Sequence, residues 1–149
     1  MENISMNISF KEGVRSATAS RRNIENTPNA DQLSAMKLLA EKVFQPLRVW
    51  YGKPIKINSF FRSIALNSQI GGSKTSQHCK GEAVDIDTAS DNAKLFNYIK
   101  DNLEFDQMIW EFGDDNNPDW VHVSYSSNGN RKKLLKAVKQ NRRTSYIGM

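Results

Sequence analysis

The segment that most constrains the fold is residues 28–52, PNADQLSAMKLLAEKVFQPLRVWYG. Its apolar residues recur at intervals of three and four positions, which places them along one face of an α-helix. Asn29 or Asp31 is positioned to cap the start of this helix. Pro46 is expected to end or kink it, and Gly52 to close it. The apolar face is expected to pack into a core through Leu33, Met36, Leu39, Ala40, Val43 and Phe44.

Four shorter segments are predicted to be strands, because apolar residues alternate with polar ones or cluster in short runs. They are residues 53–61, 82–87, 105–112 and 120–125. Further helices are expected at residues 9–22, 62–73 and 89–102. Ser90 is expected to cap the last of these, and residues 132–139 are compatible with a strand or a helix. Because several strands follow one another without helical crossovers, we predict an α+β fold with helices packed on a mainly antiparallel central sheet.

Charge is distributed unevenly along the 149 residues, whose net charge is +5. Seven of the 21 lysines and arginines lie in residues 131–149, which contain no acid; the other 14 stand against 16 acids, so residues 1–130 carry about −2. We therefore divide the chain into residues 1–130 and a basic tail that is either appended or part of the same domain. Such a tail favours anionic partners such as nucleic acid, acidic glycopolymers or a membrane surface, or it is simply a solvated end.

The remaining composition limits compartment and covalent structure. The single cysteine, Cys79, excludes an internal disulfide framework and a cysteine-rich zinc cluster. Residues 1–14 lack a basic stretch followed by an apolar one, so no secretory signal is predicted. No window approaches the roughly 18 apolar residues that a membrane span needs. We expect synthesis in the cytoplasm, so that any action outside the cell requires lysis or release.

The chain has two histidines, His78 and His122, and both are candidate metal ligands together with Asp85. Catalytic zinc sites use three imidazole or carboxylate ligands and leave one position open to water. Gly81 would allow a tight turn between His78 and Asp85. The two-residue period of residues 120–125 places His122 opposite its flanking valines, which would face the core. Taken alone, this spacing is not diagnostic, since histidines in strands are more often hydrogen-bonded residues that bind no metal.

Three ordered motifs resemble those of the zinc D-alanyl-D-alanine peptidases. Residues 76–87, SQHCKGEAVDID, resemble the family motif SxHxxGxAxD, and residues 119–125, DWVHVSY, resemble its second motif, in which an acid precedes a histidine ligand by three positions. Residues 57–73 resemble the family segment xxSxxRSxxLNxxxGGS. The resemblance extends over roughly residues 8–127. It is closest to the single-domain peptidase M15 branch found in phage and bacterial genomes, which implies a Hedgehog-like α+β fold.

The resemblance implies roles for particular residues. His78, Asp85 and His122 would bind Zn²⁺, and Asp119 would be the general base, although it also suits an ordinary turn next to Pro118. Arg62 would contact the scissile carbonyl or its oxyanion, because a guanidinium offers planar donors to developing negative charge; the alternative is a surface ion pair.

Other polar and aromatic residues near these motifs have open roles. Ser76 either hydrogen-bonds substrate or shapes the turn before His78. Glu111 is expected to be a buried structural acid, with contact to a substrate amine as the alternative. Trp120 is expected to be a cleft wall or a core residue, and Cys79 has no predicted role.

The family resemblance implies a zinc metallopeptidase that hydrolyses peptidoglycan stem peptides next to a D-amino acid. It would be a D-alanyl-D-alanine carboxypeptidase or an endolysin-type L-alanyl-D-glutamate endopeptidase, of phage or bacterial origin, acting at the bacterial cell wall. The alternative is a catalytically inactive zinc-containing module that binds the wall. A third hypothesis, binding of polyanions through the basic tail, predicts binding that weakens with salt and survives removal of zinc. Contact of the tail with anionic wall polymers is expected, and nucleic acid is not an expected partner.

Overall fold

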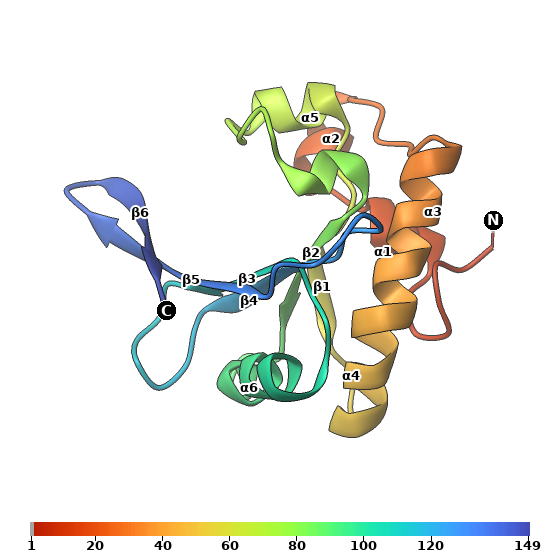
Figure 1. Ribbon diagram of the computed structural model, residues 1–149. Coiled ribbons are helices and arrows are strands. Elements are labelled where there is room, and N and C mark those ends of the chain that lie inside the picture. The colour runs from red at the N-terminus through yellow and green to blue at the C-terminus, as the bar shows by residue number, and fades with distance from the viewer. Residues whose placement is uncertain (1) are drawn as a thin grey trace.

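One mixed, six-stranded β-sheet organises the computed structural model, which describes residues 2–149 (Figure 1). The strand order is β1-β2-β4-β3-β5-β6, and every neighbouring pair is antiparallel except β3 and β5. The strands are β1 (Lys56–Ser59), β2 (Ala83–Asp87), β3 (Gln107–Glu111), β4 (Trp120–Ser124), β5 (Lys133–Gln140) and β6 (Arg143–Gly148). The predicted α+β fold with a mainly antiparallel sheet is confirmed.

Helices cover one face of this sheet and surround its β1 edge (Figure 1). The α-helices are α1 (Phe10–Val14), α2 (Ala17–Arg22), α3 (Ala30–Leu39), α4 (Gln45–Tyr51), α5 (Ile64–Gln69) and α6 (Asn92–Asn102). A π-helical segment, η1 (Ala40–Phe44), joins α3 to α4, and a 3₁₀ turn, η2 (Gln77–Lys80), precedes β2. Among residues 2–149, none of the helices is both long and apolar enough to cross a membrane.

The two faces of the sheet differ in character because side chains alternate along each strand. One face packs against α3, α4 and α6 in a single apolar core. Its central strands contribute Val84, Ile86, Met108, Trp110, Val121 and Val123. The helices contribute Met36, Leu39, Leu47, Leu95, Phe96 and Ile99, among others. The opposite face therefore presents the alternate residues of the same strands, including Asp85 and His122.

The long helical segment over residues 30–51 follows the predicted apolar stripe and ends as predicted. Asn29 caps its start, with Gln32 completing a reciprocal capping box. Gly52 ends it in the left-handed conformation, with φ of 73°. Pro46 does not terminate the helix; it lies in the first turn of α4, directly after η1. The wider π-helical turn accommodates a residue that has no N–H and whose ring crowds the preceding turn.

Two predicted helices differ in detail from the observed ones. Residues 9–22 form two short helices instead of one, because a serine caps the start of each. The N-cap of α6 is Asp91, not Ser90, and it makes no side-chain cap hydrogen bond. Instead, the side chain of Asn117, in the β3–β4 loop, accepts the N–H of Ala93 at 2.8 Å. This cap comes from a distant segment and could not be read from the local sequence.

The C-terminal residues extend the sheet. Residues 132–139, which the sequence left open between strand and helix, lie mostly in β5, parallel to β3. β6 folds back on β5 as the outermost strand, and the β5–β6 hairpin projects from the body at the sheet edge opposite to the helices (Figure 1). Residues 131–149 thus contribute two strands to the same sheet as the preceding segments.

Candidate metal centre

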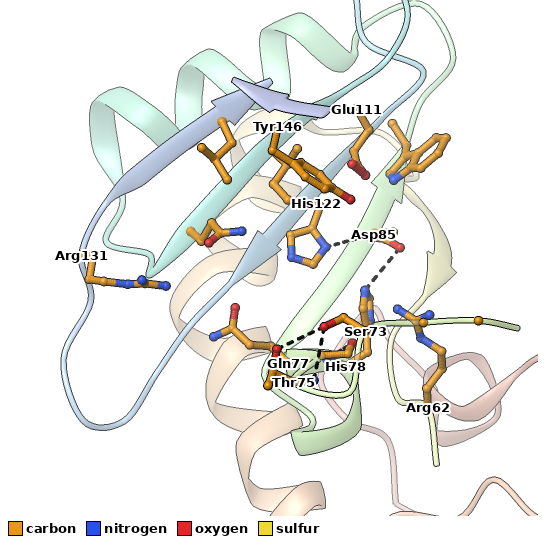
Figure 2. Close-up of a pocket in the computed structure, with 17 residues that line it drawn as sticks. Arg62, Ser73, Thr75, Gln77, His78, Asp85, Glu111, His122, Arg131 and Tyr146 are labelled. Carbon is orange, nitrogen blue, oxygen red and sulfur yellow. Dashed lines mark hydrogen bonds and ion pairs between the residues drawn. The ribbon is translucent and has the colours of Figure 1, made fainter. Parts of the chain in front are cut away.

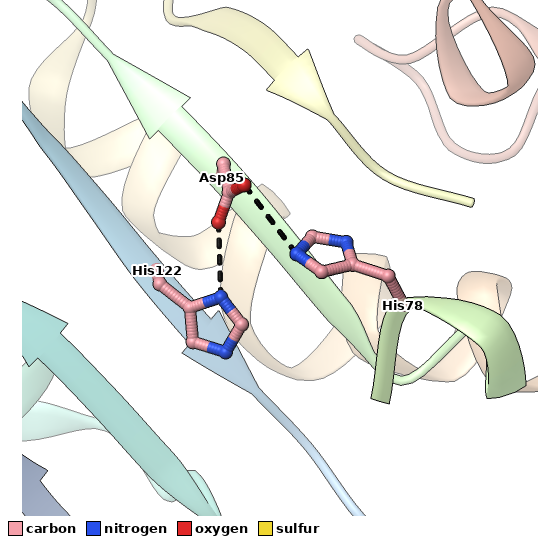
Figure 3. A group of neighbouring side chains, drawn as sticks. All are labelled: His78, Asp85 and His122. Carbon is pink, nitrogen blue, oxygen red and sulfur yellow. Dashed lines mark hydrogen bonds and ion pairs between the residues drawn. The ribbon is translucent and has the colours of Figure 1, made fainter. Parts of the chain in front are cut away.

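His78, Asp85 and His122 converge on the open face of the sheet (Figure 3). Asp85 and His122 are directly paired across β2 and β4, and His122 Nδ1 lies 2.9 Å from Asp85 Oδ1. His78 enters from η2, with its Nε2 3.4 Å from Asp85 Oδ2. One potential ligand atom from each side chain lies within 4.8 Å of the other two. Two imidazoles and a carboxylate are a donor set that zinc prefers.

The orientation of His78 is set by the backbone of another segment. Its Nδ1 lies 2.7 Å from the carbonyl oxygen of Phe60, and its side chain is only 3% exposed. If Nδ1 donates its proton to this carbonyl, Nε2 is the nitrogen left to bind a cation. Metal-binding histidines commonly have such a partner on the second nitrogen, which fixes both ring and tautomer.

The turn that carries His78 requires a glycine at its end. Gly81 follows η2 with φ of 74°, and a Cβ at this position would collide with the carbonyl oxygen of Gln32 in α3. The amide of Gln32 in turn donates to the carbonyl of Cys79 at 3.2 Å. The close packing of this turn against α3 therefore fixes where His78 enters the site, and the tight turn predicted at Gly81 is present.

Asp85 is held in its ionised form by the two histidines. Burial alone would raise the pKa of this carboxyl, but the charge and hydrogen bonds of His78 and His122 lower it well below its usual range. A carboxylate that remains charged between two imidazole rings is suited to bind a divalent cation, because ligand groups must be deprotonated.

A cleft of about 780 Å³ opens over the metal centre (Figure 2). One wall is the segment from Gly71 to His78, and the other is the open sheet face, with Ile109, Trp120, Leu135 and Tyr146. Trp120 is thus a wall of the cleft, one of its two predicted positions. Leu135 and Tyr146 come from the β5–β6 hairpin, so the C-terminal strands help to form the cleft.

Arg62 and Ser76 both line this cleft. The backbone N–H of Arg62 donates to the carbonyl of His78 at 3.2 Å, which ties the arginine to the metal-centre turn. Its Nε is buried without a hydrogen-bond partner, and within residues 2–149 its guanidinium forms no ion pair. Ser76 Oγ accepts the N–H of His78 at 3.3 Å, so the serine shapes the turn while also facing the cleft.

The structure does not bring Asp119 into the cleft. Its side chain is exposed and does not contribute to the cleft lining. Its backbone N–H donates to the carbonyl of Glu111 at 2.8 Å, and its carbonyl accepts from the side chain of Asn92 at 3.1 Å. The bend expected at Pro118 does not redirect Asp119 towards His122.

Glu111 is the acidic residue that the cleft contains in addition to Asp85. It ends β3, is 8% exposed, and pairs with Trp120 of β4, so it shares the open face with His122. Burial raises the pKa of Glu111 to about 7; nearby His122 lowers the pKa and Asp85 raises it further. The sequence predicts a structural acid at Glu111. Its place beside the metal centre follows from the pairing of β3 with β4, which local sequence does not reveal.

Arg131 and Gln77, which line the cleft, share one carboxylate partner. Arg131 binds Asp106 through two hydrogen bonds of 2.9 Å, and Gln77 donates to the same carboxylate at 3.2 Å. The hydrogen bonds from Arg131 lower the pKa of Asp106, so this carboxylate stays ionised. These hydrogen bonds link η2 to the start of the C-terminal hairpin.

A histidine–aspartate–histidine centre at the base of an open cleft defines a candidate zinc enzyme. Comparison with known families agrees: the profile of the Peptidase M15 family matches residues 6–124. The chain belongs to this family, which confirms the predicted relationship and implies a zinc-dependent metallopeptidase. No curated protein gives a significant match to the chain. The match ends at the last residue of β4, so the β5–β6 hairpin lies outside the matched segment.

Proposed function

We propose that this protein is a zinc metallopeptidase that hydrolyses peptidoglycan stem peptides next to a D-amino acid. The observation that carries the proposal is the cluster of His78, Asp85 and His122 at the base of a cleft, in a chain of the M15 family. The bond cleaved is either the terminal D-alanyl-D-alanine bond or the L-alanyl-D-glutamate bond within the stem. We propose that the enzyme acts at a bacterial cell wall after lysis or release, as phage endolysins do.

The donor atoms of the site fit a zinc ion. His78 would bind through Nε2, because Nδ1 faces the carbonyl of Phe60, and Asp85 and His122 would supply the other two ligands. A zinc ion bound there would act as a Lewis acid: it would polarise the scissile carbonyl and lower the pKa of its bound water towards about 7.

The residues around the site can perform the remaining steps of amide hydrolysis. Arg62 would donate hydrogen bonds to the carbonyl oxygen as negative charge develops on it. A carboxylate must accept a proton from the attacking water and return it to the leaving amine. Asp119 is the residue that the sequence motif suggests for this step. Trp120 and Tyr146 would pack against the peptide.

The cleft is of a suitable size for a short peptide. Its volume of about 780 Å³ lies within the range of roughly 300–1,000 Å³ found for small-molecule sites. Four apolar or aromatic side chains, Ile109, Trp120, Leu135 and Tyr146, line it, and most of the other lining residues are polar or charged. Such a lining suits a peptide, whose backbone amides and carboxylates need hydrogen-bond partners. A stem peptide of several residues would extend along the cleft with one bond over the metal centre.

The proposal is tested by mass spectrometry of stem pentapeptides and muropeptides incubated with the protein, with and without a zinc chelator. We expect a chelator-sensitive product that reappears when zinc is restored. Loss of one alanine would identify a carboxypeptidase, whereas a new D-glutamyl amino terminus would identify an endopeptidase. Zinc-loaded protein that leaves every peptide intact would contradict the proposal and favour a wall-binding module without turnover.

We also propose that the basic hairpin contacts anionic wall polymers. Two basic residues of the segment 131–149 form ion pairs with acids, since Arg131 pairs with Asp106 and Lys136 with Asp115. Arg142 and Arg143, at the tip, are exposed and form no ion pair within residues 2–149. Exposed positive charge at the projecting tip would attract a polyanion and hold the enzyme near its substrate.

A further inference from the structure

We propose that Glu111, at the end of β3, is the carboxylate that transfers the proton during peptide hydrolysis, in the position that the sequence motif gives to Asp119. This inference rests on the proposed peptidase function and names the residue that serves one of its steps.

Strand register places Glu111 next to the metal centre. In the β3–β4 pair, Ile109 lies opposite His122, and Glu111 lies opposite Trp120. Residues directly opposite each other share a face of the sheet, so Glu111 and His122 are diagonal neighbours. Diagonal neighbours in an antiparallel pair lie about 7–8 Å apart, within reach of a long side chain. Figure 2 shows the carboxylate of Glu111 directed into the cleft, on the side of Asp85 and His122.

The position of Asp119 is incompatible with the same task. It precedes β4 by one residue, and alternation from His122 places it on the opposite side of the strand. The backbone of Asp119 is held by two hydrogen bonds. Its N–H donates to the carbonyl of Glu111, and its carbonyl accepts from the side chain of Asn92. Moving the Asp119 Cβ to the cleft side would require rotation of the backbone that these two bonds hold, and the bond to Glu111 joins it to the end of β3.

The surroundings of Glu111 suit a group that exchanges protons. Its side chain is largely buried beside Trp120 and forms no ion pair with any residue in the range 2–149. The titratable groups that face it are His122 of β4, Asp85 of β2 and Tyr146 of β6. A buried carboxylate without a fixed cationic partner is not committed to a structural salt bridge. It is free to gain and lose a proton during the reaction.

The proton transfer balances without any further reactant. The carboxylate of Glu111 accepts a proton from water as the water oxygen bonds to the scissile carbonyl carbon. The resulting carboxylic acid donates that proton to the amide nitrogen as the carbon–nitrogen bond breaks. One water molecule is consumed, a new carboxyl group and a new amine are released, and Glu111 returns to its ionised form.

The test compares zinc-loaded full-length Glu111→Gln, Asp119→Asn and wild type on the stem peptide identified by mass spectrometry. Glu104→Gln, which alters an exposed acid outside the cleft, is the matched control. We expect Glu111→Gln to lower kcat by about 10²–10⁴-fold, the usual contribution of a general base. Its zinc content and its affinity for intact peptide measured by calorimetry should stay close to those of wild type, and it should not unfold at a lower temperature. Asp119→Asn should retain most of the activity.

Other outcomes overturn the inference and separate it from the proposed function. Near-normal turnover by Glu111→Gln together with inactive Asp119→Asn would overturn it, while the peptidase function would stand. Loss of zinc or peptide binding by Glu111→Gln in parallel with activity would assign Glu111 a structural role instead. Wild-type protein that binds zinc and cleaves no peptide would overturn the proposed function, and the inference with it.

Discussion

The central residue of the metal centre is Asp85, whose two carboxylate oxygens face different histidines. A carboxylate in this position must remain charged if it is to bind a cation. The pKa of Asp85 is held low by His78 and His122 despite its burial, so its charge persists at any pH at which the protein is expected to work.

Replacing Asp85 with asparagine keeps the volume of the side chain and removes its charge. Loss of an outer-sphere partner costs about 10–100-fold in metal affinity, so loss of a direct ligand should raise the Kd for zinc by more than about 100-fold. Competition with a chelating dye measures this change. Asp101→Asn, an exposed position in α6, is the control, and equal affinities for the two variants would exclude Asp85 as a ligand.

Glu111 gives a pH-dependent prediction for the metal-free protein. Its pKa is about 7 in the folded protein against an ordinary value of 4.5. As pH rises between these values, the unfolded chain releases the proton before the folded chain does, so the free energy of unfolding falls by up to about 3 kcal/mol. Glu111→Gln removes this loss and should stabilise the protein increasingly between about pH 5 and pH 8.

Urea unfolding in the presence of a chelator, repeated across that pH range, measures the effect. Glu104→Gln, which removes one negative charge at an exposed position outside the cleft, is the control. A stabilisation by Glu111→Gln that does not change with pH would contradict the raised pKa.

The three proposed metal ligands were predictable from sequence, whereas the position of Glu111 was not. His78, Asp85 and His122 belong to ordered motifs, and the structure brings them together. The position of Glu111 depends on how β3 pairs with β4, and a slip of one residue would move every side chain to the other face. The local spacing that favoured Asp119 contains no information about that register.

At the scale of elements, the η2 turn depends on its contact with α3. Gly81 and Gly71 have nearly the same backbone conformation, with φ of 74° and 73°. A Cβ at Gly81 would collide with the Gln32 carbonyl and Met36, whereas a Cβ at Gly71 would meet no atom within 4 Å. Replacing each glycine with alanine therefore distinguishes the cost of backbone strain, which both variants share, from the cost of steric clash, which only the Gly81 variant has.

Gly71→Ala should cost about 1–2 kcal/mol, the strain of a side chain in the left-handed region. Gly81→Ala should cost about 1–3 kcal/mol more because the added methyl group forces neighbouring backbone to move. It should also weaken zinc binding, since the same turn positions His78. Urea unfolding and zinc titration of both variants measure these effects; equal losses of stability would show that the turn does not pack against α3 as described.

The elements were predictable where local signals determine them. The apolar stripe of residues 30–51 and the closing Gly52 follow from local spacing and backbone preference. The passage of the helix through Pro46 was not predictable, because a π-helical turn has no simple sequence signal. The cap of α6 was also missed, since Asn117 reaches it from a loop distant in the sequence.

At the scale of the whole molecule, the sheet continues beyond the segment that defines the family. The family match ends at residue 124, yet β5 and β6 extend the sheet and supply Leu135 and Tyr146 to the cleft. Residues 132–139 could not be assigned from sequence, because the strand is defined by its parallel pairing with β3. The C-terminal hairpin therefore lies outside the matched segment and still contributes to the cleft.

Removing the two tip arginines tests the role of the hairpin. Arg142→Gln with Arg143→Gln should weaken binding to anionic wall polymer and reduce its dependence on salt, because fewer positive charges attract the polymer. Cleavage of a small soluble stem peptide should remain unchanged. Sedimentation with purified cell walls at several salt concentrations measures binding.

The matched control removes the same charge from another adjacent pair, Arg21→Gln with Arg22→Gln in α2. Equal weakening by the two double variants would show that wall binding depends on net charge and not on the hairpin.

The central claim is that His78, Asp85 and His122 together bind the zinc ion of a peptidase. Anomalous X-ray diffraction from crystals of the zinc-loaded protein, recorded on both sides of the zinc absorption edge, tests it most directly. We expect one strong peak bounded by His78 Nε2, an Asp85 carboxylate oxygen and a His122 ring nitrogen, at the base of the cleft. A zinc peak elsewhere, or none at this position in zinc-loaded crystals, would contradict it.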